Sequence, residues 1–226
     1  MNRGSLLAPP AGERRRVIGE IGGTMVYRRS AAAEQRRDRI REDVLRAART
    51  IVARAGIDGL SMAAVAAEAG VAVGSLYRHF AGRGELIAAV VERTCRRELD
   101  VLRDIAAGPE AAVPRLETAV ATFTRRALDS GRVASAVICE PTSKEPELLR
   151  RRIRAEMATI LGGLVADGIV EGALPAQDAM LTGTALVGAV SEAIVDRLAA
   201  GGAATTDETL PAQVATMAVR LAGGPR

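Results

Sequence analysis

The sequence predicts an all-α protein of about nine helices, in which a small N-terminal helical domain precedes a larger helical domain. Apolar residues recur at three- and four-residue intervals through most of the 226 residues, and no stretch alternates in the manner of a strand. Glycine and proline separate the periodic segments. With 48% hydrophobic and 26% charged residues, the composition is that of a folded protein with room for two domains.

The first 34 residues differ from the rest of the chain. They contain two consecutive prolines, scattered glycines and clustered arginines, but no sustained apolar period. Residues 1–34 are therefore predicted to be a disordered basic extension, either an upstream addition from a misassigned start or a flexible arm that contacts phosphate. The first helix is predicted over residues 35–55, where apolar residues form one stripe: Ile40, Val44, Leu45, Ala48, Ile51, Val52 and Ala55.

Residues 58–86 have the spacing of a helix-turn-helix. Ser61 is a favourable N-cap residue before an alanine-rich run, and Gly70 can adopt the left-handed backbone that ends such a helix. A second short helix is expected directly afterwards, as in motifs whose second helix enters the DNA major groove. Leu76 and Phe80 lie four residues apart and are expected to point inward together.

The second helix of this motif contains the run Gly74-Ser75-Leu76-Tyr77-Arg78-His79-Phe80. The run matches, at every defined position, the recognition helix of the TetR family of transcriptional regulators, and residues 59–86 resemble that family's DNA-binding domain. Gly84 departs from the acidic residue usual in the family. The resemblance implies a three-helix DNA-binding domain, here residues 35–82, whose partner is double-stranded DNA.

The candidate DNA contacts combine small and polar side chains at the recognition helix. Ala72 and Val73 can offer methyl contacts to thymine, and Ser75 a hydrogen bond to a base or phosphate. The resemblance favours phosphate contacts by Tyr77 and His79, for which structural roles are the alternative. The full candidate set is Ser61, Ala72, Val73, Gly74, Ser75, Tyr77, Arg78, His79 and Arg83.

Positive charge is concentrated in the first part of the chain. Residues 1–84 carry 15 arginines against 8 acidic residues, a net charge of +7, whereas residues 85–226 carry 16 basic and 19 acidic residues, a net charge of −3. Such an asymmetry is expected where one part of a protein meets a polyanion, with a solvated basic face as the alternative.

Residues 83–226 are expected to form the second domain, which the TetR resemblance makes an effector-binding and dimerisation domain. Residues 83–107 read as one long helix of about 36 Å that links the two domains. The cluster Arg150-Arg151-Arg152 is interpreted as a solvated helix face. Further helices are predicted over residues 111–130, 132–139, 146–169, 176–200 and 207–222.

The resemblance also implies a small-molecule effector bound among the helices of the second domain. Phe123 is the one aromatic residue after position 80, so an aliphatic pocket for a small apolar effector is expected. Each candidate lining residue fits equally well in a plain hydrophobic core. The candidates are Val91, Leu102, Phe123, Leu128, Val137, Ile138, Met157, Leu161 and Leu186.

The last two predicted helices are rich in small residues, which allow close approach of helices. The resemblance implies that they pair with a second copy to form a homodimer, whereas intramolecular core is the alternative. A two-fold dimer places two recognition helices about one DNA turn apart and so predicts a palindromic operator. The small residues concerned are Gly183, Ala185, Gly188, Ala189, Ala212, Ala215 and Ala218.

Residues that bind metals or carry out catalysis are sparse. Cys95 and Cys139 lie 44 residues apart without ligand partners at suitable spacing, so no metal site and no cofactor is expected. A redox-sensing role for Cys139 is only weakly indicated. No signal peptide is visible, and the most apolar run, residues 179–191, is shorter than the roughly 20 residues needed to cross a bilayer. A cytoplasmic protein without membrane contact, in which this run is a buried helix, is expected.

These patterns favour a TetR-like, sequence-specific transcriptional regulator that represses and is released from its operator by the effector. An architectural DNA-binding protein without an effector is the first alternative, and would show weak sequence preference and no cavity in the second domain. A helical enzyme is less favoured, because the chain has one histidine, no metal-ligand cluster, and neither a nucleophile elbow nor a phosphate-binding loop.

Overall fold

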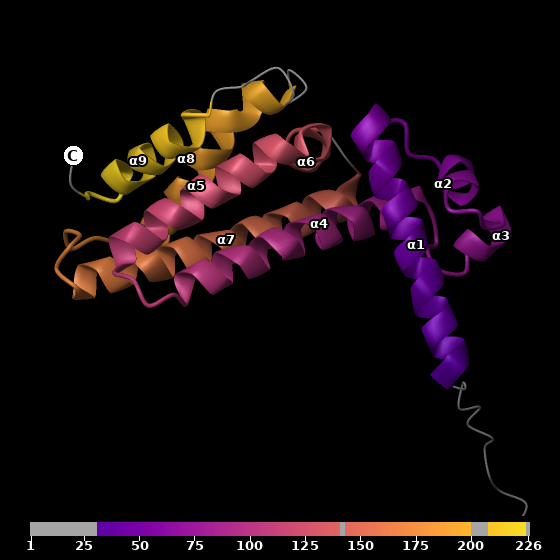
Figure 1. Cartoon of the computed structure of the whole chain (residues 1–226), viewed down its shortest axis with the longest axis horizontal. Helices are drawn as coiled ribbons and strands as arrows, with labels where there is room; N and C mark the ends of the chain where they lie inside the picture. Colours follow the sequence, from indigo (N-terminus) through magenta and orange to yellow (C-terminus); the bar gives the residue numbers. More distant parts are fainter. Residues whose placement is uncertain (1–30, 141–142, 200–207, 225–226) are drawn as a thin grey trace, which may run out of the picture.

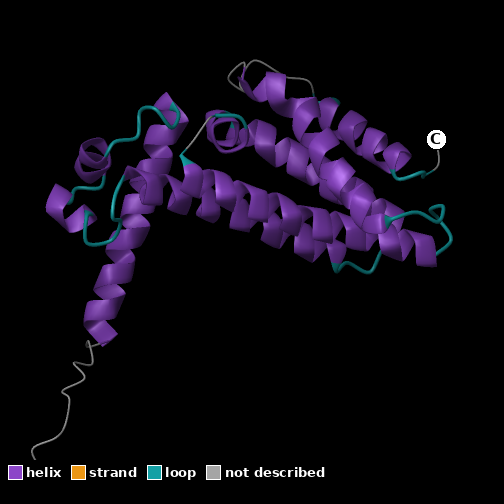
Figure 2. Ribbon diagram, turned by 180° about the vertical axis from the view of Figure 1, so that it is seen from behind, coloured by secondary structure: helices purple, strands orange, loops and turns teal. Residues whose placement is uncertain are grey.

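The computed structural model describes residues 31–140, 143–199 and 208–224, and within these ranges it contains nine α-helices and no β-strand. The expected disorder of residues 1–34 lies outside the described residues up to position 30, and it is wrong for residues 31–34, which begin the first helix. The helices form an elongated bundle with a smaller group of three helices at one end (Figure 1). Figure 2 shows the same arrangement from behind. The predicted all-α architecture is confirmed.

The N-terminal domain consists of α1 (Ala31–Ala55), α2 (Met62–Glu68) and α3 (Val73–Leu76). α1 begins before the predicted start at residue 35, because the helix extends back into an alanine-rich segment of high helix propensity. α3 is only four residues long, and its C-cap is Tyr77. The residues that follow it, which were expected to continue the helix, form tighter turns instead.

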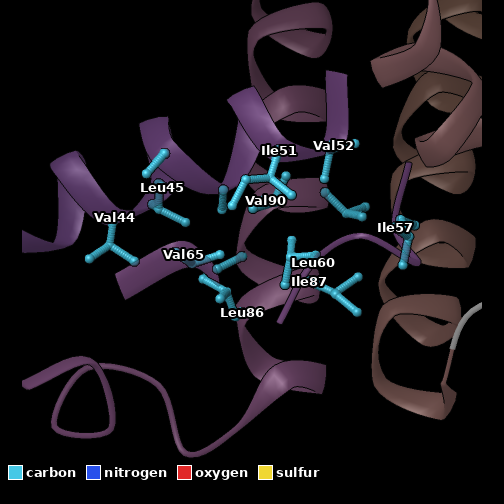
Figure 3. Packing of buried hydrophobic residues seen from close by; sticks show 14 of the residues in the cluster. Val44, Leu45, Ile51, Val52, Ile57, Leu60, Val65, Leu86, Ile87 and Val90 are labelled. Carbon is cyan, nitrogen blue, oxygen red and sulfur yellow. The ribbon is translucent and has the colours of Figure 1, made fainter. Parts of the chain in front are cut away.

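These helices enclose an aliphatic core together with the start of α4 (Arg83–Ala106) (Figure 3). Ile51 of α1, Val65 of α2 and Leu86 of α4 are among its buried members. Phe80, which is 1% exposed, is the one aromatic ring among the buried members of this cluster in the described chain. Helices as short as α2 and α3 are not stable in isolation, so packing on this core fixes their positions.

α4 is shared by both domains. Leu86 and Val90 near its start belong to the N-terminal core, whereas Leu102 near its end belongs to the core of the second domain. Its 24 residues span about 36 Å at 1.5 Å per residue. In both views α4 lies alongside α7 (Lys144–Val170), so one helix runs from the N-terminal domain along the bundle (Figures 1 and 2).

The second domain is completed by α5 (Ala112–Ser130), α6 (Arg132–Ile138), α8 (Ala179–Ala199) and α9 (Leu210–Leu221). α7 and α8 pack closely at Gly183. A Cβ atom there would lie 2.4 Å from the carbonyl oxygen of Ala158 and 2.7 Å from the backbone nitrogen of Gly162. Glycine is therefore needed at this crossing, where the two helix backbones meet.

α7 and α8 also begin away from the predicted positions, each for a local reason. α8 begins at Ala179 rather than at residue 176, because Oδ1 of Asp178 accepts hydrogen bonds from the backbone nitrogens of Met180 and Leu181, at 3.0 and 2.9 Å. α7 begins before residue 146, because proline at that position is tolerated in the first turn of a helix.

α8 has one face in the core and one face toward solvent. Leu186 and Ile194 are fully buried, whereas Met180 and Leu181 are 51% and 67% exposed. By length and composition alone α8 is long and apolar enough to cross a membrane, yet only 28% of the apolar window is buried within the chain, and a single such helix is weak evidence for a span. The prediction of a buried helix is thus correct for one face only.

The two domains meet where the end of α6 approaches the end of α1. Oε2 of Glu140 accepts a hydrogen bond from the backbone nitrogen of Ile57 at 2.8 Å, and Nη1 of Arg132 donates to the carbonyl oxygen of Arg54 at 2.8 Å. Gly56 has a φ of +68°, and a Cβ atom there would lie 2.8 Å from Oε1 of Glu140. The loop after α1 is therefore held by the second domain as well as by its own.

Candidate nucleic-acid interface and effector pocket

Local hydrogen bonds build the helix-turn-helix. Oγ of Ser61 accepts from the backbone nitrogen of Ala64 at 3.1 Å and so caps α2. Gly70 has a φ of +66°, and the backbone nitrogen of Val71 donates to the carbonyl oxygen of Ala66 at 3.0 Å, which closes the end of α2 in the left-handed manner. The turn then places α3 at the outer end of the molecule, away from the second domain (Figure 1).

α3 and its flanking residues have one buried and one open side. Leu76 and Phe80 anchor the element in the core, as predicted, whereas Tyr77 is 53% and Val73 is 42% exposed. A Cβ atom on Gly74 would meet no atom of the described chain within 4 Å, and its φ is not positive. The fold itself does not require glycine there, so the small residue leaves room for a second molecule to approach the backbone.

Polar groups continue the open side. Nη2 of Arg78 donates to Oγ of Ser75 at 3.0 Å, which ties the two side chains together. His79 is half-buried, and burial followed by the nearby cations of Arg37, Arg41 and Arg78 lowers the pKa of its imidazole. His79 is therefore neutral near pH 7 and can offer a ring N–H as a hydrogen-bond donor.

Arg37 and Arg41 of α1 lie beside the recognition turn and are not among the predicted contacts. The guanidinium carbon of Arg41 lies 4.6 Å from the ring centroid of Phe80, and its Nη1 donates to the carbonyl oxygen of His79 at 3.4 Å. Helical periodicity places both arginines on the polar face of α1, but only the packing of α1 against the turn brings that face to α3.

Two predicted DNA contacts have partners inside the chain. Ser61 caps α2, and Arg83 donates from Nε to the carbonyl oxygen of Leu60 at 2.7 Å and from Nη2 to that of Ile57 at 2.8 Å. Arg83 thus ties the loop between α1 and α2 to the start of α4. These internal hydrogen bonds explain why an arginine stands at position 83, and no contact with a DNA phosphate is needed to explain it.

A cavity opens in the second domain between α4, α5, α6 and α7, with one lining residue from α8. Its volume is about 80 Å³, below the range of roughly 300–1,000 Å³ usual for small-molecule sites, so a ligand of that size would have to displace lining side chains. Phe123, Val137, Ile138 and Met157 line it, as predicted. The cavity lies behind the part of α4 that follows the DNA-binding core.

The other predicted pocket residues lie elsewhere. Leu102 and Leu161 line a smaller neighbouring cavity of about 10 Å³. Val91 and Leu186 are buried in the hydrophobic cores, and Leu128 packs partly buried against the second core. For these last three, the alternative of plain core is correct, because a continuous apolar helix face looks the same in sequence whether it meets a side chain or a cavity.

The surface of the cavity is mainly apolar, in keeping with the expected aliphatic pocket, but polar side chains also take part in its lining. Arg126 and Glu98 form a two-point ion pair, with Nε–Oε2 at 2.7 Å and Nη2–Oε1 at 2.9 Å. The polar lining residues that the sequence did not indicate are Thr94, Cys95, Glu98, Arg126, Ser130, Arg150, Arg154 and Ser191.

Among the described residues, Arg150 is the one buried residue with a charged side chain, and it is 7% exposed. Nη1 donates to the carbonyl oxygen of Glu140 and Nη2 to that of Ala136, each at 2.7 Å, so the guanidinium caps the end of α6. Burial lowers its pKa, but an arginine remains protonated in proteins. Arg151 and Arg152 are exposed, so the predicted solvated face is correct for them and wrong for Arg150.

Neither cysteine has the character of a reactive thiolate. Burial raises the pKa of Cys95 to about 12 and also raises that of Cys139. The weak indication of redox sensing by Cys139 gains no support. Within the described part of the chain, no group of three or more histidine, cysteine, aspartate or glutamate side chains could hold a metal ion.

Part of the predicted dimerisation surface lies inside the single chain. Gly183 packs on α7, and Ala215 and Ala218 of α9 are fully buried in the second core. For these residues the intramolecular alternative is correct. The other side of α8 is exposed and is called the α8 face below; it consists of Met180, Leu181, Thr184, Ala185 and Gly188.

An exposed helix-turn-helix joined through a shared helix to a helical domain with a cavity defines a two-domain, DNA-binding regulator. Residues 44–90 match the sequence profile of "Bacterial regulatory proteins, tetR family". This match supports the resemblance to the TetR family that the recognition run predicted, over the helix-turn-helix and its flanking helices. No curated protein matches the sequence.

Solved structures share the fold at low sequence identity. The fatty acid degradation regulator FadR from Bacillus halodurans has a TM-score of 0.68 and 18% identity, covering 82% of this chain and 100% of that one. FadR from Bacillus subtilis, in complex with stearoyl-CoA, has a TM-score of 0.69 and 16% identity over 82% and 100% of the two chains. SmeT, the repressor of the Stenotrophomonas maltophilia efflux pump SmeDEF, has a TM-score of 0.66 and 17% identity over 80% and 88%. These likenesses show the fold, and the match over residues 44–90 supports a DNA-binding transcriptional regulator rather than an enzyme.

Proposed function

We propose that the chain is a homodimeric, cytoplasmic repressor that binds a palindromic operator and leaves it when a small-molecule effector occupies the cavity. The observation that carries this proposal is the double role of α4. Leu86 and Val90 of α4 pack in the DNA-binding core, and Thr94, Cys95 and Glu98, about one turn further on, line the cavity. A ligand that displaces the lining residues therefore acts on the helix that supports α3.

The open side of α3 supplies the DNA contacts in this proposal. Ala72 and Val73 are exposed at the start of the element and suit methyl contacts to bases. Tyr77, Arg78 and the neutral His79 provide hydroxyl, guanidinium and imidazole donors for phosphate oxygens. The excess of arginine in the first 84 residues supports association with a polyanion.

The α8 face supports the homodimer. Met180 and Leu181 are both more than half exposed, and the neighbouring Ala185 and Gly188 allow a second helix to approach closely. Exposed apolar patches of this kind commonly mark interaction surfaces. A two-fold axis through this face would place two copies of α3 on one side of a duplex, which is the arrangement that reads a palindrome.

Release from DNA requires that the effector bind the two conformations with different affinities. A hundredfold weakening of operator binding corresponds to about 2.7 kcal/mol of coupling. The complex of Bacillus subtilis FadR with stearoyl-CoA supports a ligand with an apolar body in a fold of this kind.

The test is selection of bound duplexes from a random DNA library by the purified chain at two salt concentrations. We expect enrichment of a palindrome by the native chain and loss of that enrichment in Tyr77→Ala. Leu148→Ala is the matched control, because it removes a side chain of similar exposure, 51% against 53%, from α7. Binding that depends on salt but not on sequence would contradict the repressor and favour an architectural DNA-binding protein.

A further inference from the structure

The cavity of the second domain holds an excess of positive charge. Its lining includes one carboxylate, Glu98, and three guanidinium groups, those of Arg126, Arg150 and Arg154. Arg126 and Glu98 neutralise each other through their two-point pair. Arg154 has no ion pair among the described residues, and Arg150 has one, at 3.6 Å, with Glu147 outside the cavity lining.

Arg150 is only partly compensated by its own chain. Its two described hydrogen bonds go to neutral carbonyl oxygens, and the nearest carboxylate oxygen, Oε2 of Glu147, lies 3.6 Å from Nη1 at a residue that does not line the cavity. Its Nε atom is buried and has no hydrogen-bond partner among the described residues. A buried donor on a cation is costly to leave unpaired, so an anion that reaches it gains more than it would at the surface.

Arg154 lies one helical turn after Arg150 and lines the same cavity from α7. Unlike Arg150 it is exposed, and within the described ranges no ion pair is found for it. The two guanidinium groups line the cavity together with the apolar side chains of Phe123, Val137 and Met157.

We infer that the effector is an anion with an apolar body, whose negative group binds at Arg150 and Arg154 while its body contacts the apolar side chains. The inference rests on the proposed function, since it names the chemical class of the ligand for the same cavity. It replaces the purely apolar effector that the aliphatic sequence pattern predicted. A carboxylate and a sulfonate both satisfy it, because each presents oxygen acceptors to guanidinium donors.

The test compares two fluorescent probes that share one skeleton. The first, 1-anilinonaphthalene-8-sulfonate, is an apolar anion, and the second, N-phenyl-1-naphthylamine, lacks the sulfonate and is neutral. Titration of the full chain with each probe gives two dissociation constants and their ratio. Differences in general hydrophobicity cancel when this ratio is compared between variants.

We expect Arg154→Gln to raise the dissociation constant of the sulfonate probe by about tenfold or more, the usual effect of losing a charge-assisted hydrogen bond. The dissociation constant of the neutral probe should change by less than about twofold. Arg150→Gln should act in the same direction and more strongly, with folding checked by circular dichroism. Because Arg154 is exposed, its variant remains informative if Arg150→Gln does not fold. Arg152→Gln removes the same charge from α7 outside the cavity and should leave the ratio unchanged.

Equal changes for both probes in Arg154→Gln would overturn the inference, as would an equal effect of Arg152→Gln or the absence of sulfonate binding by the native chain. These titrations contain no DNA. A chain that selects an operator but shows no charge-dependent probe binding would keep the proposed repressor and lose the anionic effector. A chain that shows charge-dependent probe binding but selects no operator would keep the anionic ligand and lose the proposed repressor.

Discussion

The two domains place arginine in opposite surroundings. Arg78 beside α3 is exposed, and its one described hydrogen bond goes to the Ser75 hydroxyl, whereas Arg150 in the second domain is buried and holds two backbone carbonyls. An exposed guanidinium contributes little to folding and is available to a polyanion. A buried one is part of the fold and can distinguish a charged ligand from a neutral one. Arg78 and Arg150 carry the same charge, so their different roles follow from their different burial.

The largest effect should come from removing the buried guanidinium. Arg150→Gln leaves the carbonyl oxygens of Ala136 and Glu140 without their donors, and we expect the free energy of unfolding to fall by about 2–4 kcal/mol. Arg152→Gln, two residues along the same helix and exposed, should change it by less than about 0.5 kcal/mol. Urea denaturation of both variants measures the difference, and equal values would remove the contrast between buried and exposed arginines.

On the exposed side of α3, a substitution should affect DNA binding more than folding stability. Tyr77→Ala removes a half-exposed side chain, so the free energy of unfolding should change by less than about 0.5 kcal/mol, while affinity for the selected operator falls by about 1–2 kcal/mol. Fluorescence anisotropy with a labelled operator measures the affinity. A comparable loss of folding stability would assign Tyr77 to the core rather than to DNA.

The domain junction tests whether the two regions are independent. Glu140→Ala removes the acceptor of the Ile57 N–H, and we expect a loss of about 1–2 kcal/mol in unfolding free energy together with faster hydrogen exchange at the Ile57 amide. Glu145→Ala, an exposed carboxylate at the start of α7, is the control. Unchanged exchange at Ile57 would mean that the loop after α1 is held by its own domain alone.

The smallest effect concerns Gly74, where stability and function should move in opposite directions. Gly74→Ala adds a Cβ atom that meets no described atom, so we expect the free energy of unfolding to rise by about 0.5–1 kcal/mol while operator affinity falls. Gly163→Ala on α7 is the matched control, since a Cβ atom there also meets nothing within 4 Å. It should stabilise the chain without affecting DNA binding. A Gly74→Ala variant with unchanged affinity would remove close DNA approach as the reason for this glycine.

The N-terminal domain was largely predictable because its geometry is local. The cap at Ser61, the left-handed turn at Gly70 and the inward pair Leu76 and Phe80 each depend on neighbours only a few residues away. The role of Arg83 was less accessible, since its acceptors at Leu60 and Ile57 precede it by more than 20 residues.

The cavity was less predictable because it is assembled from five helices that are distant in sequence. Periodicity identifies the inward face of each helix, and so it found Phe123 and Met157, but it cannot tell a filled interior from a hollow one. Arg150 has the same sequence surroundings as Arg151 and Arg152, and only the approach of α6 separates them. Non-local packing therefore decided both the position and the polarity of the site.

In the proposed dimer, the α8 face would make DNA binding depend on the concentration of the protein itself. A face of this kind covered by a second copy would make the DNA-binding species a product of two encounters, so that well below the dimerisation constant its amount follows the square of the monomer concentration. Doubling synthesis would then raise the dimer about fourfold. Dilution by growth in cell volume would then lower operator occupancy more steeply than it lowers the protein concentration, and the regulated gene would respond with a threshold rather than in proportion.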